Sequence, residues 1–272
     1  MTDWTRVTPA APCPVCGKPD WCGFTDTVAR CMRVESDHPS NGGWIHRIAD
    51  ARKAYQPRPA PPRPIDMTPD RLQDLLTAWQ DQTPPGALAG LADSLGLPVP
   101  ALRALTPAWS EQRGAWGFPM RSATGELRGI RLRFPDGAKR AVTGSRDGLF
   151  LPFGAPTSGP LLILEGPTDT AAAVALDYAA VGRPSCRGAT AETVAYARHW
   201  PGPVVIVADN DEPHATPDGT AWTVPGFDGA IALREAIPAA LLVALPTKDL
   251  REFWRLHGVA GRRMLDSIIG NA

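Results

Sequence analysis

Acidic residues follow two short apolar runs in the second half of the chain. Glu165 comes directly after residues 161–164, and Asp209 and Asp211 come directly after residues 204–208. Continuous apolar runs of this length predict strands that are buried on both faces of a parallel sheet. The carboxyl ends of adjacent parallel strands meet at one edge of a sheet, where α/β folds place their sites. A cluster of carboxylate oxygens there favours Mg²⁺ or Mn²⁺ over zinc.

An Ala-rich stretch, residues 171–180, lies between the two runs and predicts a crossover helix that joins the strands into a βαβ unit. A third apolar run at residues 241–245 predicts a further strand, and Lys248 and Asp249 follow it. A purely structural alternative is that Glu165, Asp209 and Asp211 cap strand ends and helix N-termini. Capping alone does not explain their spacing.

At these residues the sequence resembles the TOPRIM domain, the metal-dependent fold of bacterial-type primases, topoisomerases and some nucleases. The family motif is a strand ending in Glu-Gly-x-x-Asp, matched by residues 165–169, and a second strand ending in Asp-x-Asp, matched by residues 209–211. The primase branch adds Gly-Lys-Asp, here Thr247-Lys248-Asp249. The resemblance implies that metal ions bind to Glu165, Asp209 and Asp211. It implies supporting catalytic roles for Asp169, Lys248 and Asp249.

Charge divides the chain into two unlike halves. The formal net charge of the 272 residues is zero, but residues 1–155 carry 19 Lys/Arg and 15 Asp/Glu, whereas residues 156–272 carry 9 and 13. This asymmetry suits a nucleic-acid-binding front and a metal-binding back. No apolar run is long enough to cross a membrane and no apolar signal region begins the chain, so we expect a cytoplasmic protein without a membrane partner.

Four of the five cysteines lie close together near the N-terminus, at Cys13, Cys16, Cys22 and Cys31. In a reducing compartment such a cluster predicts a structural Zn²⁺ site, with the Cys-x-x-Cys knuckle supplying the first two thiolates. The second half lacks a Cys-x-x-Cys pair. His38 or His46 therefore stays open as a replacement for Cys22 or Cys31.

Aromatic and basic side chains surround the cysteines. Trp21, Arg30 and Arg33 suit a single-stranded nucleic acid, because bases stack on rings while cations follow the phosphates. Phe24 and Trp44 fit this role or the small core of a zinc ribbon equally well. The segment also resembles the N-terminal zinc-binding domain of primases. Cys186, far from this cluster, is expected to be an ordinary small residue.

Proline dominates residues 56–66, which predicts an extended linker. Beyond it, Thr68 and Pro69 predict the start of a helix, and residues 88–95 and 100–105 predict two more. These two favour a small packing unit over a helix-turn-helix, because no basic recognition helix follows the turn.

Residues 115–153 predict short strands with Gly turns, and this stretch is strongly basic. Arg131 and Arg133 would share one strand face while Leu132 points to the other. The stretch resembles the region before TOPRIM in primases. In that family the region binds the phosphates of the template and of the nucleotides. The predicted nucleotide-binding or DNA-binding set is Arg121, Arg131, Arg133, Lys139, Arg140 and Arg146. A solvated strand face is the alternative.

Together these features predict an α/β fold: a TOPRIM domain at 159–272 with a mostly parallel sheet, a helical and basic β subdomain at 67–158, and a zinc ribbon at 1–55 with the linker at 56–66. The residues alone indicate a metal-dependent phosphoryl-transfer enzyme that binds single strands. The resemblance narrows this to a DNA primase that uses nucleoside triphosphates, a single-stranded DNA template and two Mg²⁺ or Mn²⁺ ions. A metal-dependent nuclease and a non-catalytic single-strand-binding protein are the alternatives.

The sequence contains no phosphate-binding loop of the helicase type, so a helicase would be a separate partner. Residues 212–225 insert a Pro- and Gly-rich loop, a candidate lid, beside the acids.

Overall fold

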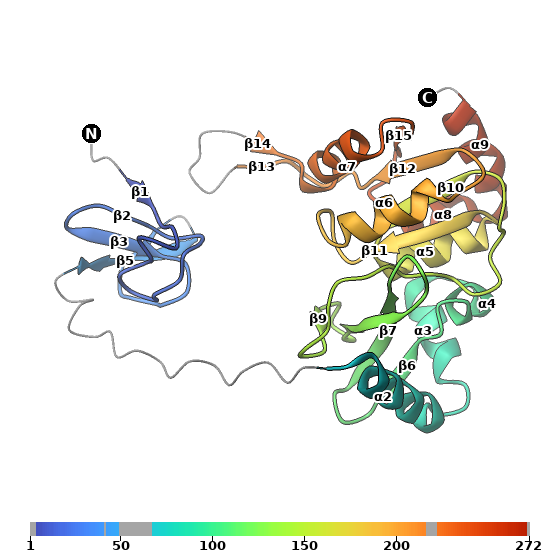
Figure 1. Cartoon of the computed structure of the whole chain (residues 1–272), viewed down its shortest axis with the longest axis horizontal. Coiled ribbons are helices and arrows are strands. Elements are labelled where there is room, and N and C mark those ends of the chain that lie inside the picture. Colours follow the sequence, from blue (N-terminus) through green and yellow to red (C-terminus); the bar gives the residue numbers. More distant parts are fainter. Residues whose placement is uncertain (1–3, 41, 49–66, 216–221, 271–272) are drawn as a thin grey trace. The chain divides into compact units, whose positions relative to one another are not determined.

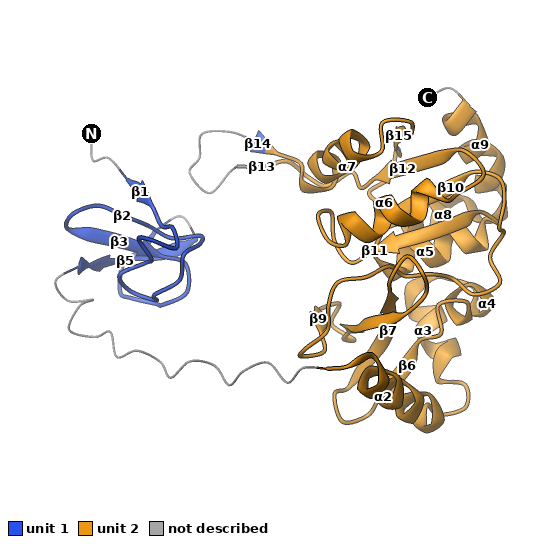
Figure 2. Cartoon of the chain, viewed as in Figure 1, with its two compact units in different colours: residues 1–64, 215–222 blue, residues 65–214, 223–272 orange. Residues whose placement is uncertain are grey.

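The computed structural model describes residues 4–40, 42–48, 67–215 and 222–270. The linker predicted at 56–66 lies outside the described residues. The chain divides into two compact units (Figure 2): unit 1 comprises residues 1–64 and 215–222, and unit 2 comprises residues 65–214 and 223–272. No helix within the described ranges has the length and apolarity needed to span a bilayer.

Unit 1 is built on an antiparallel sheet with the strand order β1-β2-β3-β5-β4. Its strands are β1 (Thr5–Arg6), β2 (Gly23–Phe24), β3 (Val28–Cys31), β4 (Pro39–Ser40) and β5 (Gly43–Arg47). Val7, Cys13, Cys22 and Cys31 form a small buried cluster, against which Phe24 packs. Phe24 therefore serves the core, one of its two predicted roles.

Unit 2 begins with helices and a four-stranded antiparallel sheet. The helices are α2 (Pro69–Gln82), α3 (Ala87–Leu95) and α4 (Val99–Arg103), and the strands are β6 (Ala108–Ser110), β7 (Ala115–Arg121), β8 (Leu127–Arg133) and β9 (Lys139–Ala141). The hydroxyl of Thr68 accepts a hydrogen bond from the Arg71 N–H, which confirms the predicted helix start. Helix α2 packs on one face of this sheet, where Leu132 is buried.

A parallel sheet with the order β11-β10-β12-β15 forms the rest of unit 2 (Figure 1). The strands are β10 (Leu161–Glu165), β11 (Ala179–Arg183), β12 (Val204–Ala208) and β15 (Leu241–Ala244). The helices are α5 (Gly166–Ala175), α6 (Thr190–Arg198), α7 (Pro225–Ala236), α8 (Leu250–His257), η1 (Gly258–Ala260) and α9 (Gly261–Gly270). The predicted α/β class is confirmed.

Two hydrophobic clusters cover the two faces of the parallel sheet. Alternate residues of β10 and β12 pack against α5 and α8 on one face and against α6 and α7 on the other. The first cluster also includes Leu102 of α4 and Phe118 of β7. The two sheets of unit 2 therefore share one core, which fixes the antiparallel sheet relative to the parallel one.

The prediction of one helix over residues 171–180 is wrong. Helix α5 ends at Ala175, and the chain then forms β11, which pairs with β10 along its whole length. Alanine has high helix propensity, but burial in the sheet decides the state of Ala179 and Ala180. Strands β10 and β12 are neighbours and parallel, as predicted, yet α5, β11 and α6 all lie between them in sequence.

The insertion at 212–225 contains a short hairpin, in which β13 (His214–Ala215) pairs with β14 (Trp222–Thr223). Residues 216–221 lie outside the described residues.

Candidate functional site

Acidic residues line one edge of the parallel sheet. Glu165 is the last residue of β10, Asp209 follows β12 directly, and Asp249 lies shortly after β15. Because these three strands are adjacent and parallel, their carboxyl ends share one edge. We call Glu165, Asp209, Asp211 and Asp249 at this position the acidic edge.

The backbone at Gly166 explains why glycine follows the acid. Its φ of 82° lies in the left-handed region, which side chains other than glycine rarely adopt. This turn lets the chain pass from β10 straight into α5, and it leaves Glu165 at the N-terminus of the helix.

Backbone N–H groups hold two of these carboxylates in place. The Gly226 N–H donates to Asp211 Oδ2 (3.2 Å), and the Glu252 N–H donates to Asp249 Oδ1 (2.7 Å) at the start of α8. Asp249 thus caps the N-terminus of α8. Each of these two contacts uses one oxygen of a carboxylate that has two.

Asp169 differs from the acidic edge because it is buried, with 4% of its surface exposed. Its Oδ1 accepts a hydrogen bond from the Arg251 N–H (2.9 Å). Asp169 therefore ties α5 to α8 beneath the edge. This position suits the supporting role predicted for it.

Burial and mutual repulsion raise the pKa values of three acids, Asp209, Asp169 and Glu165. Burial, followed by the charges of Asp169 and Glu165, raises the pKa of Asp209 to about 9. Burial and then Asp249 raise the pKa of Asp169 to about 7. The pKa of Glu165 is also raised, by burial first and Asp211 second. Without a cation nearby, the Asp209 carboxyl therefore holds a proton at neutral pH.

Basic side chains partly offset this repulsion. Lys139 and Arg183 act to lower the pKa of Glu165, and Lys139 and Arg251 act on Asp169 in the same direction. Burial lowers the pKa of Arg133, with repulsion from Arg251 adding to the effect and attraction to Asp169 opposing it. Lys139 and Arg133 of the antiparallel sheet thus lie within electrostatic range of the acids.

The predicted basic set does not form one ridge. Strands β8 and β9 pair Arg133 with Lys139 and Leu132 with Arg140, so Lys139 shares the face of Arg133 and Arg140 lies on the opposite face. There the Arg140 guanidinium lies 5.5 Å from the centroid of the Phe134 ring. Arg140 therefore does not share the strand face of Arg133, because side chains alternate along β9.

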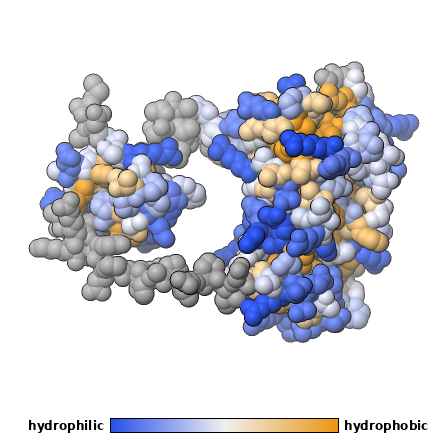
Figure 3. Space-filling view, in the orientation of Figure 1, coloured by the Kyte–Doolittle hydropathy of each residue, from blue (hydrophilic) through white to orange (hydrophobic). Residues whose placement is uncertain are grey.

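The other members of the set lie in different surroundings. Arg131 is half-buried on the face of Arg133. Arg121 donates a hydrogen bond to the Gly125 carbonyl (3.1 Å) within its own hairpin, and Arg146 is exposed. The surface over β9 is strongly hydrophilic (Figure 3), in line with the exposure of all three of its residues.

Lys248 is exposed, and its backbone joins two loops of the edge. Its N–H donates to Glu252 Oε2 (2.8 Å), and its carbonyl accepts from the Asn210 N–H (2.7 Å). The main chain of Lys248 therefore sets the spacing between the loops that carry Asp209 and Asp249.

The acidic edge is an oxygen-only donor set, which fits Mg²⁺ or Mn²⁺. Repulsion between carboxylates contributes, after burial, to the raised pKa values of Glu165 and Asp209, and a divalent cation would relieve this repulsion. Among the described residues the four cysteines are the one group of three or more candidate ligands whose atoms converge, so the carboxylates are more widely spaced than a closed ligand cage.

Sequence reasoning missed three residues next to the acids. Arg183 pairs with Glu165 across β10 and β11 and is buried, with its guanidinium held by the Gly188 carbonyl (3.1 Å) and the Thr190 hydroxyl (3.2 Å). The backbone of Cys186 hydrogen-bonds to Glu165, and Arg251 lies beside Asp169. Arg183 directly follows an apolar run, residues 179–182, and a charged residue at the end of such a run was the signal that could have identified it.

The four cysteines converge in unit 1. Their sulfur atoms all lie within 4.8 Å of one another, and no histidine belongs to the group. His46 instead contacts the Val34 carbonyl through Nε2 (2.9 Å), so replacement of a cysteine by His38 or His46 is wrong. The N–H groups of Met32 and Val34 donate to Cys22 Sγ and Cys31 Sγ (3.4 and 3.3 Å). A group of four converging sulfur atoms fits Zn²⁺, which prefers tetrahedral coordination.

Two arginines of unit 1 lie over indole rings. The guanidinium of Arg30 is 5.6 Å from the centroid of the Trp4 ring, and that of Arg33 is 5.6 Å from the centroid of the Trp21 ring. Arg33 also forms an ion pair with Asp20 (2.9 Å), while Trp21 exposes 70% of its surface. The indole of Trp21 thus offers an open face for stacking.

The fold is shared with structures of bacterial primases. A DnaG primase catalytic domain bound to single-stranded DNA matches with a TM-score of 0.54 and 15% identity, over 75% of this chain and 78% of that chain. The Escherichia coli primase catalytic core matches at 0.52 and 15%, over 75% and 80%. The chain has the fold of DnaG primase catalytic cores.

The primase of Aquifex aeolicus, with its zinc-binding and RNA polymerase domains, also matches, at a TM-score of 0.53 and 13% identity over 75% of this chain and 62% of that chain. No protein-family model and no curated protein sequence matches this chain.

Proposed function

We propose that this protein is a DNA primase, which synthesises short RNA primers on a single-stranded DNA template. The observation that carries the proposal is the acidic edge of a primase-core fold, faced by cations of a second sheet in the same unit. Transfer of a nucleotide from a triphosphate requires acids that hold metal ions. It also requires cations that neutralise the phosphates.

In this reaction the 3′-oxygen of one nucleotide attacks the α-phosphorus of a nucleoside triphosphate, and pyrophosphate leaves. Glu165, Asp209 and Asp211 would hold the two divalent ions, with Asp169, Lys248 and Asp249 as support. When bound, such ions activate the 3′-hydroxyl and neutralise the triphosphate.

The basic residues nearest the acids would hold the phosphates. Lys139 and Arg133 occupy one face of the antiparallel sheet and act electrostatically on Glu165 and Asp169. Arg183 is a positioning residue in this proposal: it is buried beside Glu165 and favours the ionised carboxylate. Arg121, Arg131, Arg140 and Arg146 would contribute to the path of the template.

Unit 1 would bind Zn²⁺ through Cys13, Cys16, Cys22 and Cys31 and contact single-stranded DNA through Trp21, Arg30 and Arg33. The domain division proposed from the sequence goes with these roles: zinc binding in 1–55, a linker at 56–66, phosphate binding in 67–158 and catalysis in 159–272. A separate helicase and a cytoplasmic location belong to the same proposal.

A primer-synthesis assay tests the proposal. The full chain is incubated with single-stranded DNA, Mg²⁺ or Mn²⁺ and labelled nucleoside triphosphates, beside Glu165→Gln and the control Glu235→Gln, which changes an exposed acid of α7. We expect short products from the wild type and the control. Glu165→Gln should lose at least about a hundredfold of the activity, because a ligand of the metal site is neutralised, while DNA binding persists.

Two results would refute the primase. Metal-dependent shortening of the DNA without synthesis would identify a nuclease that uses the same acids. DNA binding with neither reaction would identify a non-catalytic binding protein.

A further inference from the structure

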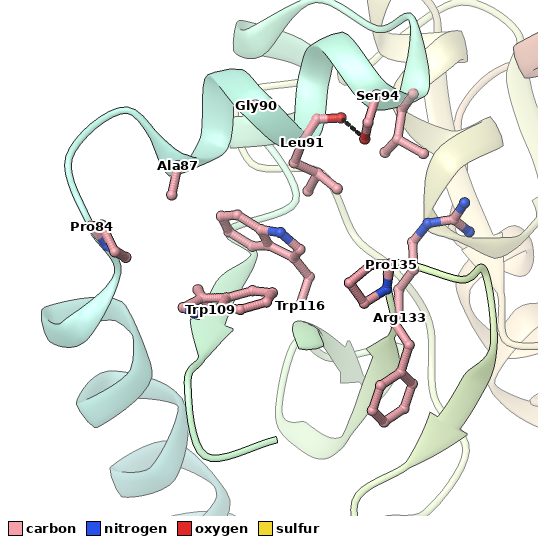
Figure 4. Close-up of a pocket in the computed structure, with 11 residues that line it drawn as sticks. Pro84, Ala87, Gly90, Leu91, Ser94, Trp109, Trp116, Arg133 and Pro135 are labelled. Carbon is pink, nitrogen blue, oxygen red and sulfur yellow. Dashed lines mark hydrogen bonds between the residues drawn. The ribbon is translucent and has the colours of Figure 1, made fainter. Parts of the chain in front are cut away.

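A pocket of about 380 Å³ opens between α3 and the antiparallel sheet, apart from the acidic edge. In Figure 4 helix α3 forms one wall, and the indoles of Trp109 and Trp116 lie opposite it. Pro135, in the turn after β8, lies on the side of Arg133. Its volume falls in the range of about 300–1,000 Å³ that is typical of small-ligand sites.

Flat and apolar groups make up most of the lining. The two indoles lie with their ring centroids 5.7 Å apart at 59°, so they present differently oriented faces. Trp116 is buried, with 8% exposed, whereas Trp109 is half-buried and open to the pocket. Apolar side chains of Leu91 and Leu95 complete the wall. Such rings are the surfaces on which nucleic-acid bases stack.

The pocket also has a charge of one sign. Arg133 is its cation, and no acid occurs among the lining residues that the structure describes. Arg133 is the cross-strand partner of Trp116, so both side chains share a face of the sheet. In Figure 4 its guanidinium extends away from the two indoles. Arg133 also interacts electrostatically with Arg251 and Asp169. A ligand there would combine a flat apolar part with an anionic group.

We propose that this pocket binds one unstacked nucleobase, with the attached phosphate next to Arg133. The proposal rests on the primase function above, because the pocket and the acids are then connected by one nucleotide strand or one nucleotide. The base belongs either to the template or to a nucleoside triphosphate, and both present the same ring and phosphate.

The test fills the pocket without removing its walls. Gly90 lies on α3 and lines the pocket, and a Cβ at this position meets no atom within 4 Å. Gly90→Leu therefore places a side chain in open space, and it favours the helix. Ala89→Leu is the matched control, since Ala89 is an exposed neighbour on α3 outside the lining.

Two affinities are measured for each full-length variant. Fluorescence anisotropy gives the affinity for a labelled oligothymidylate, and equilibrium dialysis gives the affinity for a labelled nucleoside triphosphate. We expect Gly90→Leu to weaken one of them about tenfold, which corresponds to about 1.4 kcal/mol, in the range of one base stacked on an aromatic ring. Ala89→Leu should change neither. Loss for the oligonucleotide alone identifies a template base, and loss for the triphosphate alone identifies the base of the substrate.

An oligonucleotide of abasic sites separates base binding from backbone binding. Equal losses on intact and abasic strands would overturn the proposal, as would unchanged affinities for both ligands. Thermal melting of Gly90→Leu confirms that the fold is intact. A base-dependent loss in a protein without synthesis would support the pocket while refuting the primase, so the two proposals fail separately.

Discussion

Replacement of one acid of the edge by its neutral isostere should stabilise the protein while it removes activity. The carboxyl of Asp209 has a pKa raised from 3.8 to about 9, first by burial and then by the neighbouring acids. Between these pH values the folded state binds the proton that the unfolded state has lost. The free energy of unfolding therefore falls as pH rises, by at most about 1.4 kcal/mol per pH unit.

The magnitude follows from this slope. From pH 4 to pH 7 the limit for Asp209 is about 4 kcal/mol of stability lost. Asp169, whose pKa is raised to about 7, takes up protons in the same range and so relieves part of the repulsion. We expect Asp209→Asn to raise the free energy of unfolding by about 2 kcal/mol at pH 7. The gain should be small near pH 4, where about half of the carboxyls are protonated even in the unfolded state.

Urea unfolding of the magnesium-free protein at pH 4, 5.5, 7 and 8.5 measures this gain, with Glu235→Gln as the control for an exposed acid. Millimolar Mg²⁺ should then stabilise the wild type more than Asp209→Asn, because the cation neutralises the same charge. A variant that is less stable than the wild type at pH 8.5, or a difference that does not change with pH, would refute the account of the acidic edge.

Two further substitutions test other parts of the structure. Cys31→Ser should abolish stoichiometric zinc binding, measured by metal analysis, and make unit 1 sensitive to protease. Unit 2 should keep its melting transition, because it has its own core. Retention of full zinc content would contradict the four-cysteine site. Gly182→Ala should cost about 1–3 kcal/mol in urea unfolding, since a Cβ there would lie 2.1 Å from Thr170 Oγ1 and 2.9 Å from the Gly166 carbonyl oxygen. Gly270→Ala, whose Cβ meets no atom within 4 Å, should show no such loss.

Strong local patterns in the sequence predicted the elements that carry the acids. The apolar runs before Glu165 and Asp209 form the adjacent parallel strands β10 and β12, because burial on both faces requires continuous apolar sequence. Strand β11 was missed for the opposite reason. Its residues 179–182 are small, so their sequence does not distinguish a buried strand from a helix.

The surroundings of the acids depended on tertiary contacts that no local pattern encodes. The alternation along β9 separates Lys139 from Arg140, but only the pairing of β8 with β9 shows which of them shares a face with Arg133. Arg183 and Arg251 reach the acids from separate elements. The pocket formed by Trp109 and Gly90 likewise arises only when α3 packs beside the antiparallel sheet.

The hydrogen bond between the Gly226 N–H and Asp211 has a consequence for how this protein can diverge in evolution. It joins the two ends of the 212–225 insertion, and Gly226 lies so close to Asp209 that a Cβ would be 2.7 Å from the carbonyl oxygen of that residue. The Thr223 hydroxyl donates to Asp228 just inside the helix that follows. With both ends held in this way, the loop can gain or lose residues at low entropic cost without displacing the carboxylates. Related chains can therefore differ in the length of this loop while they keep the positions of Asp209 and Asp211.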